Sequence, residues 1–187
     1  MDVHKLHPLF GAELTGADLT QPPSAELVDT VEALMREHAV LCIRGQGAIS
    51  DADHLRFARA FGPLELPPGY AARKAAPGRI APELYDASNL DAHGEIIDPA
   101  SLRAKFAKGN ELFHADSSFN DMPSKWSMLR GKIVPPEKGD TQFVDLRAVH
   151  DALPQAMKDR IEGLVAEHSF AASREKGGAK NAEAQRH

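Results

Sequence analysis

Hydrophobic residues recur at helical spacing in two stretches of the chain. After Ser24, whose side chain can cap a helix, apolar residues stand three or four positions apart: Leu27, Val28, Val31, Leu34 and Met35. After Ser50, a second potential cap, a similar pattern is formed by Leu55, Phe57, Ala58 and Phe61. Gly62-Pro63 then stops the second run. The spacing predicts amphipathic helices over residues 25–38 and 51–61.

Shorter apolar runs predict strands. Residues 39–43 are continuously apolar, which is typical of a strand buried on both faces. Two short extended pieces are expected within residues 7–19, and further strands over residues 80–89, 111–114, 126–134, 141–144 and 166–170. Helices are expected over residues 145–151 and from Leu153-Pro154 onward. The fold class is therefore α+β, with a mainly β core.

Composition limits the size of this core. The chain has 187 residues, 42% of them hydrophobic and 26% charged, which suits one folded domain. After Phe170 it has no apolar residue larger than alanine, so little surface can be buried there to offset ordering entropy. We expect a domain over residues 1–170 and a disordered tail over residues 171–187.

Charge and cysteine content exclude several classes of protein. The net charge is −5 and the pI is about 6.0, which argues against a nucleic-acid partner bound through phosphate neutralisation. No apolar run approaches the ~20 residues that span a bilayer, so no membrane role is expected. A single cysteine, Cys42, fits a reducing compartment, so we expect a cytoplasmic protein. Small molecules remain the expected partners, and homo-oligomerisation stays open.

His114-Ala115-Asp116 is the sharpest candidate for chemistry. On a strand, side chains two positions apart point to the same side, so this imidazole and carboxylate could converge on one cation. Non-haem Fe(II) oxygenases bind their metal through two histidines and one carboxylate. A lone His-x-Asp also occurs by chance, as a hydrogen-bonded pair on a surface strand. A zinc site is disfavoured, because structural zinc prefers four Cys and His ligands.

Several further segments give this pair a context. Asn110-Glu111-Leu112-Phe113 precedes it, Ser117-Ser118-Phe119 follows it, and Gly139-Asp140-Thr141 comes later. The chain resembles the TauD/TfdA family of Fe(II)/2-oxoglutarate-dependent dioxygenases, most closely the 2,4-dichlorophenoxyacetate dioxygenase branch. The segments that carry the resemblance, in family order, are residues 6–10 with 16–19, 40–46, 57–64, 110–119, 134–143, and 151–154 leading into 161–164.

The resemblance implies a double-stranded β-helix, or jelly roll, here incomplete and flanked by helices. It also implies an enzyme that hydroxylates a small anionic organic acid, such as an aryloxyalkanoate, with Fe(II), O2 and 2-oxoglutarate, which becomes succinate and CO2. His114 and Asp116 correspond to the first two iron ligands, and Thr141 to the hydroxyl that bonds the 2-oxoglutarate carboxylate. Asn110 corresponds to a polar contact near the substrate, or is a turn asparagine. Sulfonates and other small acids are alternative substrates.

The sequence departs from the family at two functions. The resemblance implies a distal histidine ligand and an arginine that binds the far carboxylate of 2-oxoglutarate, but this sequence contains neither motif. The remaining histidines and arginines that were considered are therefore assigned no site role: His150, His168, His187, Arg174 and Arg186. We expect a fragment of an active dioxygenase, a truncated reading frame, or a protein completed by a partner chain. The alternative is an inactive relative that acts at most as a binding module. A basic loop, with Arg73, Lys74 and Arg79, either neutralises an anionic substrate or is solvated.

Overall fold

The computed structural model describes residues 1–67, 70–75, 78–101, 104, 111–169 and 172. These residues belong to two compact units. The first comprises Met1–Leu64 and Met128–Gly163, and the second comprises the described residues of Glu65–Ser127 and Leu164–His187. The expected tail over residues 171–187 lies outside the described residues, apart from Ala172.

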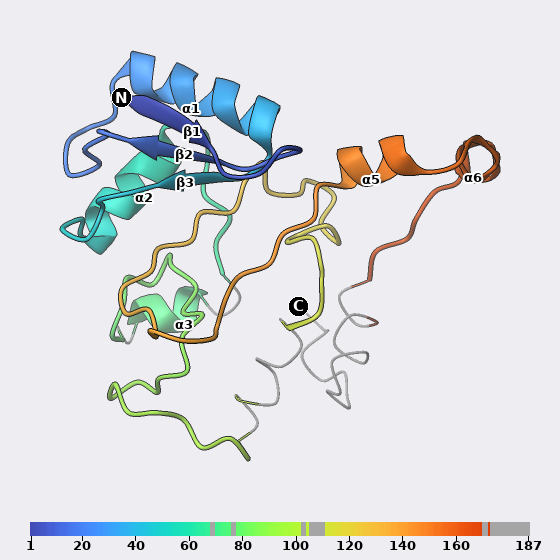
Figure 1. The fold of residues 1–187 in the computed structure, drawn as a ribbon. Coiled ribbons are helices and arrows are strands. Elements are labelled where there is room, and N and C mark those ends of the chain that lie inside the picture. Colours follow the sequence, from blue (N-terminus) through green and yellow to red (C-terminus); the bar gives the residue numbers. More distant parts are fainter. Residues whose placement is uncertain (68–69, 76–77, 102–103, 105–110, 170–171, 173–187) are drawn as a thin grey trace. The chain divides into compact units, whose positions relative to one another are not determined.

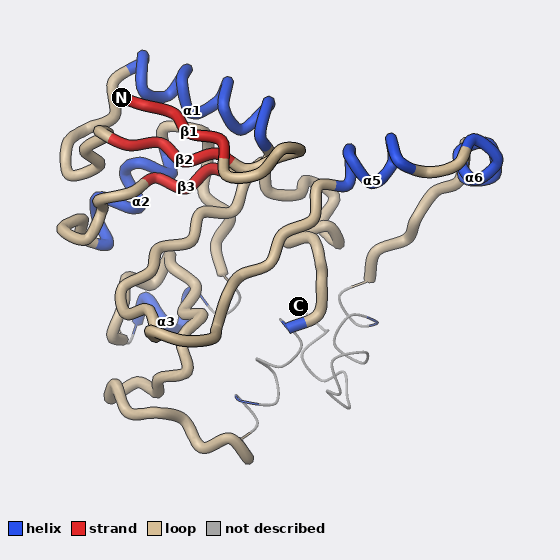
Figure 2. The backbone as a smooth tube through the Cα atoms, viewed as in Figure 1, coloured by secondary structure: helices blue, strands red, loops and turns tan. Residues whose placement is uncertain are grey.

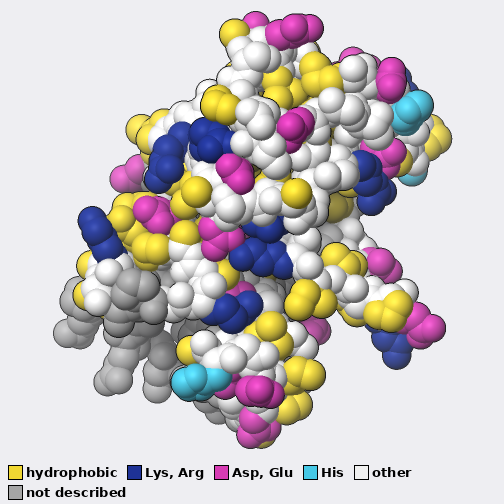
Figure 3. Space-filling view, turned by 90° about the vertical axis from the view of Figure 1, so that its left-hand side faces the viewer, with side chains coloured by type: hydrophobic (Ala, Val, Ile, Leu, Met, Phe, Trp, Pro, Cys, Tyr) yellow, Lys and Arg dark blue, Asp and Glu magenta, His cyan; other side chains and the backbone are white. Residues whose placement is uncertain are grey.

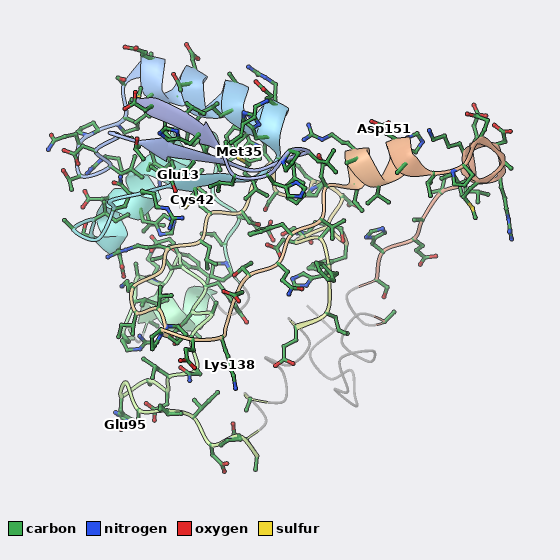
Figure 4. All side chains as sticks on the ribbon, in the orientation of Figure 1. Glu13, Met35, Cys42, Glu95, Lys138 and Asp151 are labelled. Atoms are coloured by element: carbon green, nitrogen blue, oxygen red, sulfur yellow. The ribbon has the colours of Figure 1, made fainter. Side chains whose placement is uncertain are left out.

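A three-stranded sheet organises the first unit (Figure 1). Its strands are β1 (Asp2–Lys5), β2 (Ala12–Thr15) and β3 (Leu41–Ile43), and β2 lies in the centre. β1 pairs with β2 in antiparallel fashion, with Val3 opposite Leu14. β2 pairs with β3 in parallel, and Glu13 and Cys42 lie side by side on them (Figure 4). Of the pieces expected within residues 7–19, β2 is present, whereas β1 was not predicted.

Helix α1 (Ala25–His38) connects β2 to β3 and contacts β3. Parallel neighbours require such a crossover, because a tight hairpin cannot join them. The Ser24 Oγ accepts a bond from the Leu27 amide at 3.1 Å, which caps the first turn. The helix ends at Ala39, whose left-handed φ of 62° lets its amide donate to the Met35 carbonyl at 3.0 Å. The prediction of a helix over residues 25–38 is confirmed.

The core of the first unit lies around the central strand. Ala12 and Leu14 alternate along β2 with no exposed surface, so both point to one face. The other buried apolar residues come from α1, α2 and the loops beside them: Leu19, Leu27, Val31, Ile49, Leu55 and Phe57. β3 is only half-buried along its length. The expectation that residues 39–43 form a strand buried on both faces is therefore wrong in its burial, because β3 is three residues long and has a partner on one side only.

Helix α2 (Asp51–Arg59) begins with a capping box. The Asp53 amide donates to Ser50 Oγ at 3.1 Å, and the Ser50 amide donates to Asp53 Oδ2 at 2.8 Å. The hydroxyl of Ser50 and its amide hold the pKa of the Asp53 carboxyl down at about 2, with a further contribution from Arg56. The Arg56 Nη2 also donates to the Thr20 carbonyl at 2.7 Å, which ties α2 to the preceding loop.

The remaining part of the first unit is mostly irregular (Figure 2). Helices α5 (Leu146–Ala152) and α6 (Gln155–Ile161) confirm the two helices expected after residue 144. The strands expected over residues 126–134 and 141–144 are absent from the described chain. Ile133 is 85% exposed, and Leu129 and Phe143 are exposed too. These segments have strand-like composition, but no neighbouring strand pairs with their backbone.

Loops also dominate the second unit, whose one described helix longer than a single turn is α3 (Tyr70–Ala75). The strands expected over residues 80–89, 111–114 and 166–170 do not form within their described residues. One isolated bridge joins Leu90 and Ile96. Local hydrogen bonds take the place of a ladder there, as when the Asp91 carboxylate accepts from the His93 and Glu95 amides. Apolar side chains on the surface stand among charged ones (Figure 3), and no described helix is long and apolar enough to cross a membrane.

Replacing Leu14 by alanine should destabilise the first unit more than any surface truncation. Leu14 is fully buried on the central strand, so the change leaves a cavity. We expect a loss of about 2–5 kcal/mol in the free energy of unfolding, measured by urea denaturation. Leu9→Ala, at an exposed loop position, is the matched control and should cost below about 0.5 kcal/mol. Equal losses for the two variants would contradict this placement of the core.

Asp53→Asn should change the acid stability of the chain. The folded-state pKa of Asp53 is lowered from 3.8 to about 2, so the carboxylate stabilises the folded state above pH 4. That contribution disappears as the pH falls from 4 towards 2. Urea unfolding of wild type and variant should therefore differ at pH 6 and converge near pH 2. Asp29→Asn, on the exposed face of α1, controls for net charge. A difference that does not change with pH would refute the role of this carboxylate.

Candidate metal centre

His114 and Asp116 face one another in the second unit. The His114 Nε2 lies 3.2 Å from the Asp116 Oδ1, and the two side chains are 47% and 57% exposed. The sequence therefore predicted correctly that the imidazole and the carboxylate converge. It was wrong about the reason, because neither residue lies on a strand.

A turn brings the two side chains together. Residues 116–119 form it, and Ser117 takes a left-handed backbone conformation with φ of 56°. The Asn120 amide donates to the Ser117 carbonyl at 3.0 Å, and the Ser118 Oγ to the Ala115 carbonyl at 3.3 Å. The chain thus reverses directly after Asp116, and its carboxylate stays beside the imidazole two residues earlier.

The imidazole of His114 is oriented by the backbone. Its Nδ1 lies 2.7 Å from the Leu112 carbonyl oxygen. A carbonyl can only accept, so Nδ1 carries the hydrogen, and in the neutral ring Nε2 presents its lone pair to Asp116. A metal ion bound at Nε2 would therefore lie beside the Asp116 Oδ1, which is 3.2 Å from this nitrogen. The donor pair fits Fe(II), which takes imidazole nitrogen and carboxylate oxygen.

The carboxylate of Asp116 is oriented by a serine. The Ser127 Oγ donates to Asp116 Oδ2 at 2.6 Å, which leaves Oδ1 towards His114. Ser124, in the same loop, donates to the Glu65 carboxylate and lies 3.5 Å from the Ser117 Oγ. These partners could not be predicted from the sequence, because no spacing rule connects a serine to a carboxylate eleven residues earlier.

His168 lies beside the same turn. Its Nδ1 is 2.7 Å from the Ser118 Oγ, although the sequence analysis assigned this histidine no role. Within the described residues, no group of three or more His, Cys, Asp and Glu side chains is placed to hold a metal ion. The described part of the candidate centre is therefore the pair of His114 and Asp116.

The other two predicted site residues remain predictions. Thr141 belongs to the first unit and is exposed. It follows a turn in which Lys138, labelled in Figure 4, and Gly139 both have left-handed φ values, of 65° and 77°. Asn110 lies outside the described residues.

The basic loop is partly neutralised by the chain itself. The Arg79 guanidinium forms an ion pair with Asp86 and donates to the Ser88 Oγ at 2.8 Å. Burial acts to raise the pKa of Asp86, but hydrogen bonds from Ser88 and the charge of Arg79 outweigh it and lower that pKa. Lys74 lies over the Tyr70 ring, with its Nζ 6.0 Å from the ring centroid. Arg79 is therefore engaged by Asp86 and Ser88.

Comparison with known proteins places this chain in a family. The model of the "Taurine catabolism dioxygenase TauD, TfdA family" matches residues 2–187. The chain belongs to the TauD/TfdA family. It is 42% identical over 166 residues to the alpha-ketoglutarate-dependent 2,4-dichlorophenoxyacetate dioxygenase of Cupriavidus pinatubonensis, an alignment that covers 87% of this chain and 56% of that relative.

Two further proteins are similar to this chain, one in sequence and one in structure. The (S)-phenoxypropionate/alpha-ketoglutarate-dioxygenase of Sphingobium herbicidovorans is 33% identical over 177 residues, covering 95% of this chain and 56% of the relative. The crystal structure of AAD-2, in complex with Mn(II) and N-oxalylglycine, matches with a TM-score of 0.86 and 34% identity. That match covers 98% of this chain and 62% of AAD-2. The chain thus spans little more than half the length of the curated relatives it matches.

His114 and Asp116 should bind a divalent transition metal as a pair. We expect His114→Ala and Asp116→Ala each to weaken Co(II) binding by about tenfold or more, because each removes a donor from the same ion. The double variant should lose less than the sum of the two free-energy changes, since the sites are coupled. Titration followed by the visible Co(II) spectrum measures this. His150→Ala is the control, because His150 is an exposed histidine beside another aspartate. Unchanged Co(II) binding in both single variants would contradict the site.

Proposed function

We propose that this chain forms the part of an Fe(II)/2-oxoglutarate-dependent dioxygenase that carries the first two iron ligands, His114 and Asp116. Membership of the TauD/TfdA family supports this, because the matched relatives are named as dioxygenases that depend on alpha-ketoglutarate. The contact between the two side chains, at 3.2 Å, is the observation that carries the proposal.

The two ligands provide an open site. Bound Fe(II) would supply the oxidative decarboxylation of 2-oxoglutarate by O2, coupled to hydroxylation of a substrate C–H bond. In the balance, one oxygen atom enters the substrate, and the other enters succinate as CO2 leaves. His114 would offer Nε2 and Asp116 would offer Oδ1. A third protein ligand would be needed beside them, and the remaining positions would stay open for cosubstrate and oxygen.

Thr141 and Asn110 complete the proposed assignments. The exposed Thr141 hydroxyl would donate to a carboxylate of 2-oxoglutarate. The two residues with left-handed φ, Lys138 and Gly139, lie shortly before it in the chain. Asn110 would contact the substrate. The substrate would be a small organic acid such as an aryloxyalkanoate, in keeping with the two named relatives.

The proposed complete fold is a jelly roll of which this chain supplies a part. The segments over residues 128–134 and 141–144 support this view, since they have strand-like composition, expose large apolar side chains and pair with no strand within the described chain. Ile133 and Val134 expose most of their surface, as edge residues do before a neighbouring strand covers them. Additional strands would pair with these segments and bury their side chains.

Succinate formation tests the proposed function. The 187-residue chain alone, given Fe(II), ascorbate and 2-oxoglutarate, should form little succinate, because a facial site needs three protein ligands. A chimera that continues into the second half of the Cupriavidus relative should form succinate in an iron-dependent reaction. His114→Ala in the chimera should lower the rate at least about 100-fold. A folded, metal-binding chimera without turnover would argue for an inactive relative instead.

Product analysis with the same chimera tests the substrate class. We expect 2,4-dichlorophenoxyacetate to stimulate succinate formation and to release the phenol and glyoxylate, since hydroxylation next to an ether oxygen gives an unstable hemiacetal. Taurine, a sulfonate, serves as the comparison and should stimulate less than a tenth as strongly. Preferential release of sulfite from taurine would reassign the substrate to the sulfonates.

A further inference from the structure

A hydrogen bond to Asp116 comes from Ser127, a residue that has no role in the proposed function. The Ser127 Oγ donates to the Asp116 Oδ2 at 2.6 Å. An ionised carboxylate only accepts hydrogen bonds, so the hydroxyl hydrogen must point at this oxygen. A bond from a hydroxyl to a charged oxygen at this distance is among the stronger hydrogen bonds in proteins.

We infer that Ser127 is a positioning residue that makes Asp116 bind the metal through one oxygen only. This inference rests on the proposed function of His114 and Asp116 as iron ligands. With Oδ2 held by Ser127, Oδ1 is the oxygen that faces the His114 Nε2. A carboxylate that used both oxygens would take one more coordination position, and that position is needed for 2-oxoglutarate or oxygen.

The same loop has a second attachment, to Glu65, which does not involve Asp116. The Asn120 Nδ2 donates to the Glu65 Oε1 at 3.1 Å, and Ser124 donates to the other oxygen of this carboxylate. Glu65 therefore holds the loop over residues 120–124, between the turn at Asp116 and Ser127. Ser124 and Ser127 carry the same hydroxyl group three residues apart. The Ser127 hydroxyl donates to Asp116, whereas the Ser124 hydroxyl donates to Glu65.

His114 has the corresponding arrangement on its own side. Its Nδ1 donates to the Leu112 carbonyl, just as Asp116 accepts from Ser127. Metal ligands are commonly oriented by such outer partners, whose loss lowers metal affinity by about 10- to 100-fold. A backbone carbonyl cannot be removed by mutation, so Ser127 is the partner that can be tested.

The test is Co(II) titration of the full 187-residue chain, followed by its visible spectrum, with three serine variants. Ser127→Ala should weaken Co(II) binding by about 10- to 100-fold and shift the absorption bands, because the carboxylate becomes free to bind through both oxygens. Ser127→Thr keeps the hydroxyl and should restore both the affinity and the spectrum. Far-UV circular dichroism confirms that each variant folds.

Ser124→Ala is the matched control, because it removes a hydroxyl from the same loop without touching Asp116. Its effect on Co(II) affinity should be below about threefold, and its bands should stay in place. If Ser124→Ala weakens binding as much as Ser127→Ala, the effect belongs to the loop and the inference fails. If Ser127→Ala binds Co(II) as wild type does while His114→Ala does not, the inference fails and the proposed metal site stands. If His114→Ala also binds as wild type does, the proposed site itself is refuted.

Discussion

A strand forms only where a neighbouring backbone pairs with its amide and carbonyl groups, and this constraint distinguishes the parts of the described chain. β2 has a partner on both sides, and the residues fully buried along it anchor the core of the first unit. Residues 128–134 and 141–144 have a similar apolar character and no partner within the described chain, so they remain irregular and exposed. Composition alone therefore does not make a strand; the ladder does.

Local geometry, in contrast, is enough to bring His114 and Asp116 together. The left-handed conformation of Ser117 reverses the chain after Asp116, and the Leu112 carbonyl fixes the ring of His114. Neither interaction needs a sheet. A pair that depends on a turn and on hydrogen bonds can form without a strand, which explains why His114 and Asp116 meet although their predicted strand is absent.

The sequence predicted what depends on neighbours along the chain and failed where a distant partner decides. Both long helices were predicted because their spacing and their serine caps, Ser24 and Ser50, are local signals. β1 was missed because four exposed residues, two of them charged at neutral pH, carry no alternating pattern and are ordered only by pairing with β2. The convergence of His114 and Asp116 was predicted from period-two spacing, which gave the right outcome through the wrong element.

The orientation of His114 and Asp116 depends on neighbours along the chain, whereas a third ligand for the proposed metal would depend on residues farther away. The two proposed ligands are oriented by partners within eleven residues, Leu112 and Ser127. Glu65 and His168 contact the same turn and loop from far along the chain. Under the proposed function, a third protein ligand would come from outside this turn, because a facial site takes donors on three sides of the ion and the turn presents two. Such a ligand would close a longer loop, at an entropic cost that grows only slowly with loop length. In the proposed jelly roll, strand pairing would offset that cost, whereas the contact between His114 and Asp116 needs no such pairing.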